Sequence, residues 1–436
     1  MLELVIGVAL LAQSQAAGSA PNQTLRAPRL RRPNIVVIVA DDFGVDLLDS
    51  YAEGFDPPCT PNIDGLAADG MLFRNAWANP ACTTTRAATL TGRHGFRTGI
   101  GTPGIGGTLS LNEFILPEML PEYTTTCVGK WHLSANQQPL HPNASGFDHF
   151  AGSLGFGLAD YYTWTKVIDG QVSTSTTYAT TDTTDEAIAA ITRMPEPWFT
   201  WVAFNAPHTP YHEPPSSLCS ASPCPDTWCS TLPTNPSNLD LGNAMIEAMD
   251  TEIGRLLAVL EVVDPNAMVI FIGDNGTAGQ LSQAPFLPSH AKGTVYEGGV
   301  NVPLIVRGPG VMQAECDGLV SCVDLFATLA EIAHSSAGTE DSVSMVPYFR
   351  NPTQSIRDTV YTERFSPNGG APPFADHHRA IREQRYKLIR KTGSPDEFYD
   401  LESDPFETWN LLPNLTTGEQ AVYESLVAEL SSLGVG

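Results

Sequence analysis

Four short apolar runs, each followed at once by polar residues, constrain the fold of this chain more than any other feature. The runs cover residues 35–39, 124–128, 198–204 and 268–272, and a shorter fifth run covers 304–306. Apart from run 124–128, which reads Thr-Thr-Thr-Cys-Val, they are dense in Val, Ile and aromatic residues, and the runs are bounded by Gly and Pro. Such runs are typical of strands that are buried on both faces of a sheet.

Helical patterns lie between these runs. Thr60 and Pro61 are a typical N-cap and first helical residue, and residues 245–260 and 320–333 are further predicted helices. Strands that alternate with helices predict an α/β fold, in which helices sandwich a mostly parallel central sheet. In such a sheet, ligands bind at the carboxyl ends of the strands.

The C-terminal part of the chain has a different pattern. Residues 379–390 alternate as an antiparallel hairpin does, and residues 397–401 add a short strand. We therefore predict an α/β domain over residues 30–345 and a smaller α+β subdomain, with an antiparallel sheet, over residues 346–436.

The first twenty residues have the pattern of a signal peptide. Residues 4–12 are nearly all apolar, small residues follow up to residue 20, and the run is too short to span a membrane. We predict a signal peptide over residues 1–20 and an exported protein, secreted or periplasmic; the alternative interpretation is a buried strand. No later stretch is long and apolar enough to cross a bilayer.

The chain contains eight cysteines, which agree with export because disulfides persist in oxidising compartments. Cys219, Cys224 and Cys229 lie in one loop rich in Pro and Ser. We favour local disulfides there over a zinc site, because zinc ligands usually come as close cysteine pairs with a second pair or histidines elsewhere. Cys316 and Cys322 are a further candidate pair.

The acidic composition restricts the partners. The 436 residues include 48 Asp and Glu against 23 Lys and Arg, which gives a formal net charge of −25. A surface this acidic repels phosphate backbones, so nucleic acid is not an expected partner. With 42% hydrophobic residues, the chain can still form a sizeable core.

Carboxylates and an amide follow two of the predicted strands. Asp41 and Asp42 come after the first run, and Asp274 and Asn275 come after the fourth. Adjacent like charges at a sheet edge are costly unless a cation neutralises them, and oxygen ligands of this kind suit Ca²⁺ or Mg²⁺. A single Asp here is more often a turn residue or helix cap, whereas the two pairs together favour a metal site.

A polar segment and several basic residues complete the predicted site. The segment from Cys82 to Arg86 precedes Ala-Ala-Thr-Leu and predicts a helix start whose free N–H groups would hold an anion. The basic residues expected at the same edge are Arg86, Lys130, His132, His208 and Lys292. A metal with Arg and Lys facing a bound anion suits sulfuryl or phosphoryl transfer.

Six motifs follow one another in order along residues 33–412: NIVVIVADDFG, CTTTRAATLTGR, GKWHL, APHTPY, GDNG and KGTVYEGGVNVPLIVRGPG. Together they resemble the motifs of the type I sulfatases of the alkaline-phosphatase superfamily. The resemblance implies an alkaline-phosphatase-like fold. It also implies that the chain hydrolyses small-molecule or carbohydrate sulfate esters to an alcohol and sulfate.

The resemblance implies a metal and a modified nucleophile. One Ca²⁺ ion would be held by Asp41, Asp42, Asp274, Asn275 and the side chain at position 82. Cys82 would be oxidised by a formylglycine-generating enzyme to formylglycine, whose hydrate is the nucleophile.

The resemblance assigns further roles to the basic residues. Arg86 and Lys130 would hold the hydrate, and His132 would act as the base when the sulfated intermediate collapses. Lys130, His208 and Lys292 would bind the sulfate oxygens. His208 would also donate the proton to the leaving alcohol.

One position departs from the family pattern, which prefers Pro two residues after the cysteine, where this chain has Thr84. If Thr84 prevented conversion of Cys82, the chain would be a sulfatase-like binding protein without turnover. The nearest rival enzyme is a phosphodiesterase or phosphonate monoester hydrolase of the same superfamily, with the same metal and formylglycine.

Substrate specificity is expected from three loops, residues 101–111, 146–170 and 219–229. Aromatic residues of the second loop could stack on a sugar or an aryl ring. These residues are Phe156, Tyr161, Tyr162 and Trp164.

Overall fold

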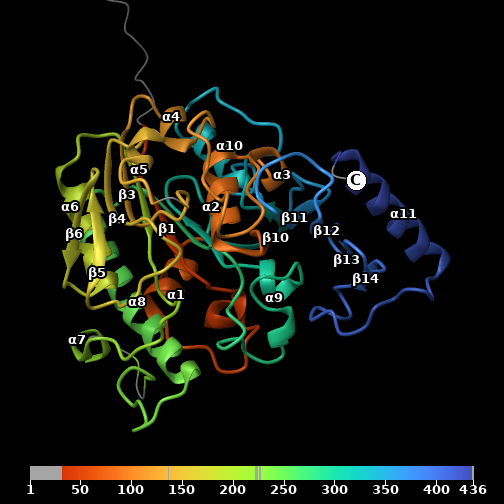
Figure 1. Ribbon diagram of the computed structural model, residues 1–436, viewed down its shortest axis with the longest axis horizontal. Coiled ribbons are helices and arrows are strands. Elements are labelled where there is room, and N and C mark those ends of the chain that lie inside the picture. The colour runs from red at the N-terminus through yellow and green to blue at the C-terminus, as the bar shows by residue number, and fades with distance from the viewer. Residues whose placement is uncertain (1–31, 136, 221–223, 225–226, 435–436) are drawn as a thin grey trace, which may run out of the picture. The chain divides into compact units, whose positions relative to one another are not determined.

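The computed structural model describes residues 32–135, 137–220, 224 and 227–434. Its main element is a ten-stranded sheet (Figure 1). The strands are β1 (Ile35–Ala40), β2 (Met71–Trp77), β3 (Thr124–Lys130), β4 (His149–Ser153), β5 (Trp164–Ile168), β6 (Gln171–Ser175), β7 (Trp198–Ala203), β8 (Met268–Gly273), β9 (Leu304–Arg307) and β10 (Ala314–Ser321). The predicted signal peptide over residues 1–20 lies outside the described residues.

The sheet is parallel at its centre and mixed at its edges. The strand order is β10-β2-β9-β8-β1-β7-β3-β4-β5-β6. The central strands from β8 to β4 pair in parallel, whereas β9 is antiparallel to both β8 and β2, and β5 and β6 form an antiparallel edge. The predicted α/β fold with a mostly parallel sheet is therefore confirmed.

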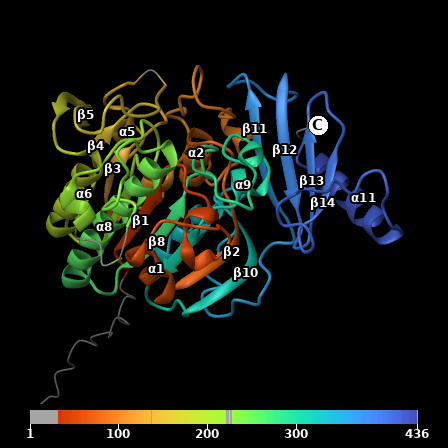
Figure 2. The ribbon, with the colours of Figure 1, turned by 90° about the horizontal axis from the view of Figure 1, so that it is seen from below.

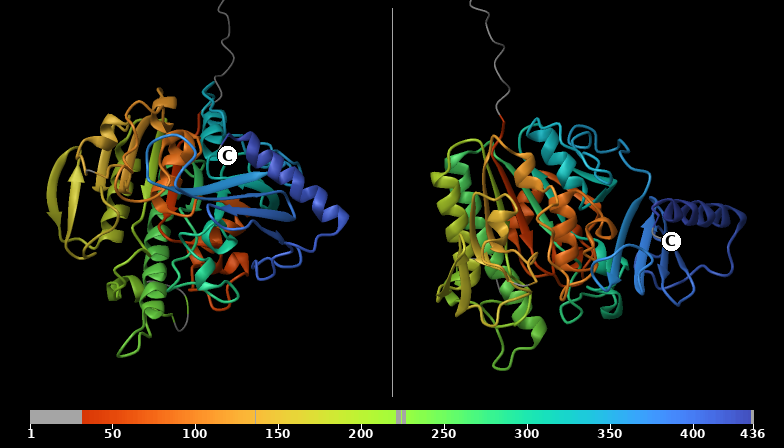
Figure 3. Two further views of the ribbon diagram at one scale, coloured as in Figure 1. Left: turned by 45° about the vertical axis from the view of Figure 1, so that its right-hand side comes forward. Right: turned by 45° about the horizontal axis from the view of Figure 1, so that its top comes forward.

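Helices cover both faces of this sheet (Figure 3). Val37 and Val39 of β1 pack into a core with α2 (Cys82–Thr91), α4 (Leu116–Met119) and α10 (Asp324–Ile332). Val36 and Ile38 point to the opposite core, which contains α1 (Pro61–Ala68), α6 (Ala179–Arg193) and α8 (Asn238–Val263). Successive side chains of a strand point to opposite faces, so a strand covered on both sides is apolar throughout, as β1 is.

Several short helices connect these elements. The remaining α-helices outside the C-terminal region are α3 (Gly95–Thr98), α5 (His141–Ala144), α7 (Ser216–Ser220) and α9 (Glu297–Val300). Three 3₁₀ turns are η1 (Val45–Leu47), η2 (Asp49–Tyr51) and η3 (Pro288–His290). Within the described ranges, no helix combines the length and the apolar character needed to cross a membrane.

A second sheet of four antiparallel strands forms the C-terminal region (Figure 2). Its strands are β11 (Val360–Ser366), β12 (Asp376–Arg382), β13 (Tyr386–Lys391) and β14 (Glu397–Asp400). Helix α11 (Thr417–Ser432) packs Leu426 and Leu430 into a core with Leu388 and Phe398 of this sheet. The predicted hairpin is thus confirmed, and the domain boundary at residue 346 stays a prediction.

The predicted helix over residues 320–333 begins too early. Leu319, Val320 and Ser321 pair with β2 and belong to β10, and the helix α10 starts only at Asp324. Asp324 accepts a hydrogen bond from the backbone N–H of Ser321 at 2.9 Å and so marks the change from strand to helix. An apolar strand end that runs into an apolar helix leaves no break in the local pattern.

The predicted Cys316–Cys322 disulfide is wrong, because both cysteines are free and buried. Cys316 lies in β10 and Cys322 follows its last residue. An extended strand rises about 3.3 Å per residue, so the two Cα atoms lie too far apart for a disulfide. The disulfide-rich loop is confirmed in part: Cys219 pairs locally with Cys229, whereas Cys224 pairs with Cys59 across 165 residues.

Candidate active site

The carboxyl ends of four neighbouring strands carry most of the predicted site residues. In the spatial order β8, β1, β7, β3 these residues are Asp274 and Asn275, Asp41 and Asp42, His208, and Lys130 and His132. Helix α2 begins beside them with Cys82 and Arg86, and Lys292 lies in the loop before α9. The structure therefore brings all the predicted site residues to one edge of the sheet.

Three carboxylates and a thiol form the centre of this cluster. Ligand atoms of Asp41, Asp42, Cys82 and Asp274 all lie within 4.8 Å of one another, and all four side chains are buried. The backbone N–H of Asp42 donates to Asp274 Oδ1 at 3.0 Å, and Asn275 Nδ2 donates to Asp42 Oδ1 at 3.0 Å. Asp42 has a φ of 65°, an unfavourable angle for a residue with a Cβ, and such angles concentrate at functional sites.

Each of the three carboxylates has a cationic partner. The pairs are Arg86–Asp274, Lys130–Asp41 and Lys292–Asp42. Arg86 is the best fixed of the cations, since its Nε and Nη2 donate to Asp274 Oδ2 at 3.1 and 2.8 Å, and its Nη1 donates to the carbonyl of Lys130 at 2.8 Å. The side chains alone thus balance the formal charge of the carboxylates.

Two oxygens of the cluster are buried without a hydrogen-bond donor. They are Asp41 Oδ1 and Asn275 Oδ1. A buried oxygen with no partner costs free energy comparable to a lost hydrogen bond. Carboxylate and amide oxygens are the ligands of hard divalent cations, so the donor set and the unpaired oxygens both fit a metal such as Ca²⁺.

The Cys82 thiol is not an active nucleophile in this environment. Its Sγ lies 3.6 Å from Asp42 Oδ1. Burial, together with the nearby carboxylates of Asp274 and Asp41, raises the pKa of the Cys82 thiol well above its usual range. A thiol must ionise to act as a nucleophile, so this environment disfavours the reactive form of Cys82.

Two histidines lie beside this cluster. His132 has a φ of 55°, and its Nε2 shares a hydrogen bond of 2.9 Å with Thr83 Oγ1. His208 Nδ1 donates to the carbonyl of Thr209 at 2.9 Å, which leaves Nε2 as the acceptor nitrogen of the neutral ring. Burial, followed by the charge of Lys130, lowers the pKa of His132 well below its usual range and that of His208 to about 4.

Phe156 connects the histidines with the lysines. Its ring lies edge to face with His132 and His208, at centroid distances of 5.4 and 4.8 Å. The ammonium groups of Lys130 and Lys292 lie 5.7 and 5.9 Å from the same ring. The Phe156 side chain is 54% exposed, so it is accessible to a ligand.

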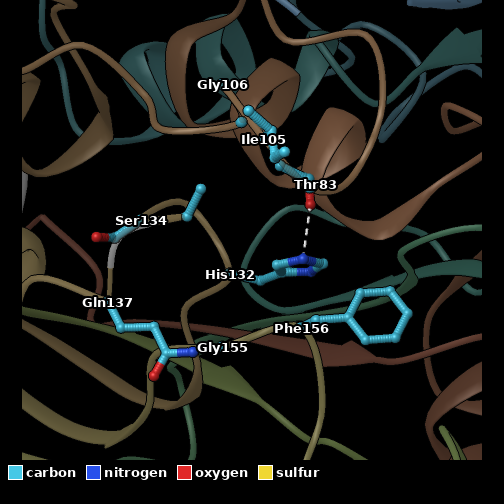
Figure 4. Close-up of a pocket in the computed structure, with 11 residues that line it drawn as sticks. Thr83, Ile105, Gly106, His132, Ser134, Gln137, Gly155 and Phe156 are labelled. Carbon is cyan, nitrogen blue, oxygen red and sulfur yellow. Dashed lines mark hydrogen bonds between the residues drawn. The ribbon is translucent and has the colours of Figure 1, made fainter.

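A cavity of about 330 Å³ opens directly above His132 (Figure 4). Its lining includes Thr83, His132, Phe156, residues 104–107 and Gln137. Two of the three predicted specificity loops, residues 101–111 and 146–170, therefore contribute to it. Thr83 and Gln137 were not predicted: the sequence singles out Thr83 only as a neighbour of Cys82, and nothing in the sequence marks Gln137.

The other predicted stacking residues are less accessible than Phe156. Tyr161 is buried and donates from its hydroxyl to the carbonyls of Asn205 and His208, so it supports the loop that carries His208. Trp164 is also buried. Only Tyr162, which is 41% exposed, remains available for stacking. The described end of loop 219–229 contacts α8, since Glu247 accepts hydrogen bonds from the backbone of Trp228 and Cys229.

Comparison with known proteins agrees with this site. A family model described as Sulfatase matches residues 33–335. The chain belongs to the sulfatase family. A second model of the family, described as N-sulphoglucosamine sulphohydrolase, C-terminal, matches residues 289–435.

Individual sulfatases show how far the similarity extends. The chain is 32% identical to N-acetylgalactosamine-6-sulfatase of Canis lupus familiaris over 362 residues, which are 72% of this chain and only 65% of the canine protein. It is 29% identical to arylsulfatase G of Rattus norvegicus over 84% of this chain and 77% of the rat protein. Among solved structures, that of Ps i-CgsB superposes with a TM-score of 0.75 at 25% identity and covers 92% of this chain and 93% of that one.

Proposed function

We propose that this chain hydrolyses sulfate esters to an alcohol and inorganic sulfate, at a Ca²⁺ ion and a formylglycine hydrate derived from Cys82. The observation that carries the proposal is the buried cluster of Asp41, Asp42, Asp274 and Asn275 beside the first residue of α2. Membership of the sulfatase family and the similarity to proteins named as sulfatases support the same conclusion.

The charge of the site supports a metal bound together with an anion. Three carboxylates already balance three cations, so a divalent cation adds net positive charge to a buried cluster. A sulfate ester carries one negative charge, so a bound ester would offset half of this excess. Asp41, Asp42, Asp274 and Asn275 would hold the Ca²⁺ ion, which supplies charge stabilisation for the sulfuryl group when bound.

A formylglycine hydrate, when formed at position 82, supplies one hydroxyl to attack sulfur and a second whose deprotonation releases sulfate. Arg86 and Lys130 reach this position from α2 and β3 and would orient the hydroxyls. His132 would accept the proton on sulfate release, since its ring is neutral and fixed by the hydrogen bond with Thr83.

The leaving-group side of the site would be formed by His208 and Lys292. His208 keeps Nε2 free of the hydrogen bond that holds Nδ1, and Nε2 carries no proton while the ring is neutral. Nε2 would take up a proton when the sulfate ester brings negative charge beside it, and would pass that proton to the departing alcohol oxygen. Lys292 donates to Asp42 and, with Lys130, would contact the sulfate oxygens. Lysine provides a point charge suited to a tetrahedral anion.

Thr84 is compatible with maturation of Cys82. It occupies the first turn of α2, where its hydroxyl donates to the carbonyl of Ala81 at 2.6 Å. Proline is tolerated in a first turn, because the N–H groups there have no partner within the helix. Thr84 and the proline of the family pattern therefore both allow the same helix start.

The decisive experiment combines mass spectrometry and kinetics. Protein from a host with a formylglycine-generating enzyme is digested, and the peptide containing residue 82 is expected to have the mass of formylglycine. Matched 4-nitrophenyl sulfate and phosphate esters are then compared by kcat/KM in the presence of Ca²⁺. Cys82→Ala is expected to abolish turnover, whereas Cys316→Ala, at another buried free cysteine, is the matched control.

Three results would overturn the proposal. Intact cysteine at position 82 in protein from its native host would favour a binding protein without turnover. A large preference for the phosphate ester would favour a phosphodiesterase or phosphonate monoester hydrolase. Full activity of Cys82→Ala would exclude the nucleophile assigned here.

The compartment and the domain organisation belong to the same proposal. The disulfides Cys59–Cys224 and Cys219–Cys229 favour an exported protein, secreted or periplasmic, because such bonds persist in oxidising compartments. We place the catalytic domain at residues 30–345 and the C-terminal subdomain at residues 346–436. Release of residues 1–20 would be checked by N-terminal sequencing of the exported protein.

A further inference from the structure

A second cavity adjoins the one above His132. It has a volume of about 430 Å³ and is lined largely by residues of β5, β6 and the loop before β5. Gln137 and Gly155 line both cavities, so the two are neighbouring parts of one binding region. Figure 4 shows the Gln137 amide beside Gly155. A ligand held at the candidate active site would extend from one into the other.

The lining of this region is uncharged. Among the described residues that line either cavity, none is Lys, Arg, Asp or Glu. The polar groups are hydroxyls and an amide, such as those of Thr163, Thr165, Thr174 and Gln137. The two lysines of the candidate active site, Lys130 and Lys292, form ion pairs with Asp41 and Asp42.

In strand β5, the charged side chain points away from the cavity. Thr165 and Val167 line the cavity, whereas Lys166 between them points to the opposite face of the strand. There its ammonium donates to Asp182 at 2.5 Å and to Glu186 at 2.7 Å. This lysine is therefore unable to contact an anion in the cavity.

A negatively charged residue lies on the loop that lines the second cavity. Asp160 lies on the loop between lining residues Ala159 and Thr163 and accepts hydrogen bonds from the backbone N–H groups of Tyr162 and Thr163. The chain as a whole carries a formal charge of −25. A second anionic group on a ligand would thus lose water in these cavities, find no cation among the described lining residues and be repelled.

We propose that the substrate is a single sulfate ester on an otherwise uncharged molecule, a neutral saccharide or similar neutral alcohol, and not a polysulfated or uronate-bearing glycan. The inference rests on the proposed function and adds the substrate class. Phe156 provides an exposed ring for the apolar face of a sugar, and the threonine hydroxyls and the Gln137 amide provide neutral hydrogen-bonding partners.

The test uses substrate pairs that differ only by a second anion. One pair is N-acetylglucosamine 6-sulfate and glucosamine 2-N,6-O-disulfate; the other is 4-nitrophenyl sulfate with and without a ring carboxylate. The member of each pair with a single anionic group is expected to have a kcat/KM at least about tenfold higher. Recognition of the member with two anionic groups leaves the second anion unpaired. Equal values, or a preference for the charged members, would overturn the inference.

A matched pair of variants tests the physical cause. Gln137→Lys places a cation at a residue that lines both cavities. We expect it to raise the kcat/KM of the doubly anionic substrate relative to that of the singly anionic one by about three- to tenfold, with a smaller effect at high salt. Gln420→Lys makes the same change on an exposed position of α11 and is expected to leave the ratio unchanged. The same ratio in both variants would refute the role of the uncharged lining.

Failure of the proposed function remains distinguishable from failure of this inference. If the protein releases sulfate from no substrate, the proposed hydrolysis fails. The charge preference is then measured as the Kd of each member of a pair by titration calorimetry with Ca²⁺ present. Weaker binding of the charged member would uphold the uncharged region, and equal binding would refute it.

Discussion

A buried lysine of the second sheet holds together two carboxylates close to the candidate active site. Lys387 on β13 is fully buried and lies 3.0 Å from Glu297 Oε1 and 2.7 Å from Glu407 Oε1. Glu297 begins α9, in the same segment that carries Lys292. The lysine therefore connects the C-terminal sheet to the segment that carries Lys292, the residue proposed to bind sulfate.

Replacement of Lys387 by methionine keeps the volume of the side chain but removes its charge. The carboxylates of Glu297 and Glu407 then share a buried site in which Arg382, 3.3 Å from Glu297, still provides a cation. Removal of one partner of a buried ion pair costs about 3–5 kcal/mol, because the remaining charge is desolvated and unpaired. We expect Lys387→Met to lower the free energy of unfolding at pH 8 by that amount.

The loss is expected to shrink as the pH falls. Burial raises the pKa of Glu407 to about 7, although Lys387 opposes this shift. The folded state therefore takes up a proton at Glu407 between about pH 7 and the ordinary glutamate value, and this uptake stabilises folding as the pH falls. Without Lys387 the pKa of Glu407 rises further, so the variant regains more stability than the wild type between pH 8 and pH 5.

Urea unfolding at pH 8 and pH 5, followed by tryptophan fluorescence, measures both effects. Lys391→Met on the same strand is the matched control, since Lys391 pairs with Glu397 at a partly exposed position and its loss is expected to cost about 1 kcal/mol or less. Equal losses in the two variants, or a difference from wild type that does not change with pH, would refute the reasoning.

Three further predictions address the site and the covalent links. Treatment with EDTA is expected to abolish release of 4-nitrophenol and lower Tm, with both restored by Ca²⁺; unchanged activity would exclude a required metal. His132→Ala is expected to lower kcat by about 10²–10⁴-fold with little change in KM, and an effect on KM alone would contradict its role as base. Cys59→Ser is expected to lower the free energy of unfolding in urea by about 5 kcal/mol and Cys219→Ser by about 3 kcal/mol, because the closed loops span 165 and 10 residues. Equal losses in the two variants would contradict loop entropy as the cause.

The central strands and their polar ends were predictable because each depends on neighbours along the chain. An apolar run such as that of β1 is continuous only when both faces of a strand are covered, and the polar residues Asp41 and Asp42 mark its end. The resemblance of the motifs to those of sulfatases then indicated which chemistry to expect of the cluster that these strand ends form. Fold class and candidate site thus followed from local patterns together with one rule about parallel sheets.

Pairings between distant segments were not predictable in the same way. The end of β10 and the start of α10 are both apolar, and only pairing with β2 separates Ser321 from Asp324. Likewise, Cys224 pairs with Cys59 rather than with a cysteine of its own loop. The local sequence around these residues is equally compatible with either outcome.

By itself, the sequence determined which residues would stand at the strand ends, since hydrophobic periodicity and turn chemistry act over a few residues. Only the tertiary structure decided that Tyr161 supports the His208 loop while Phe156 lines the cavity above His132, that Gln137 lines both cavities, and that Lys387 pairs with two glutamates distant in the sequence. Burial and charge pairing depend on which segments meet in space, and that follows from the packing of the whole chain.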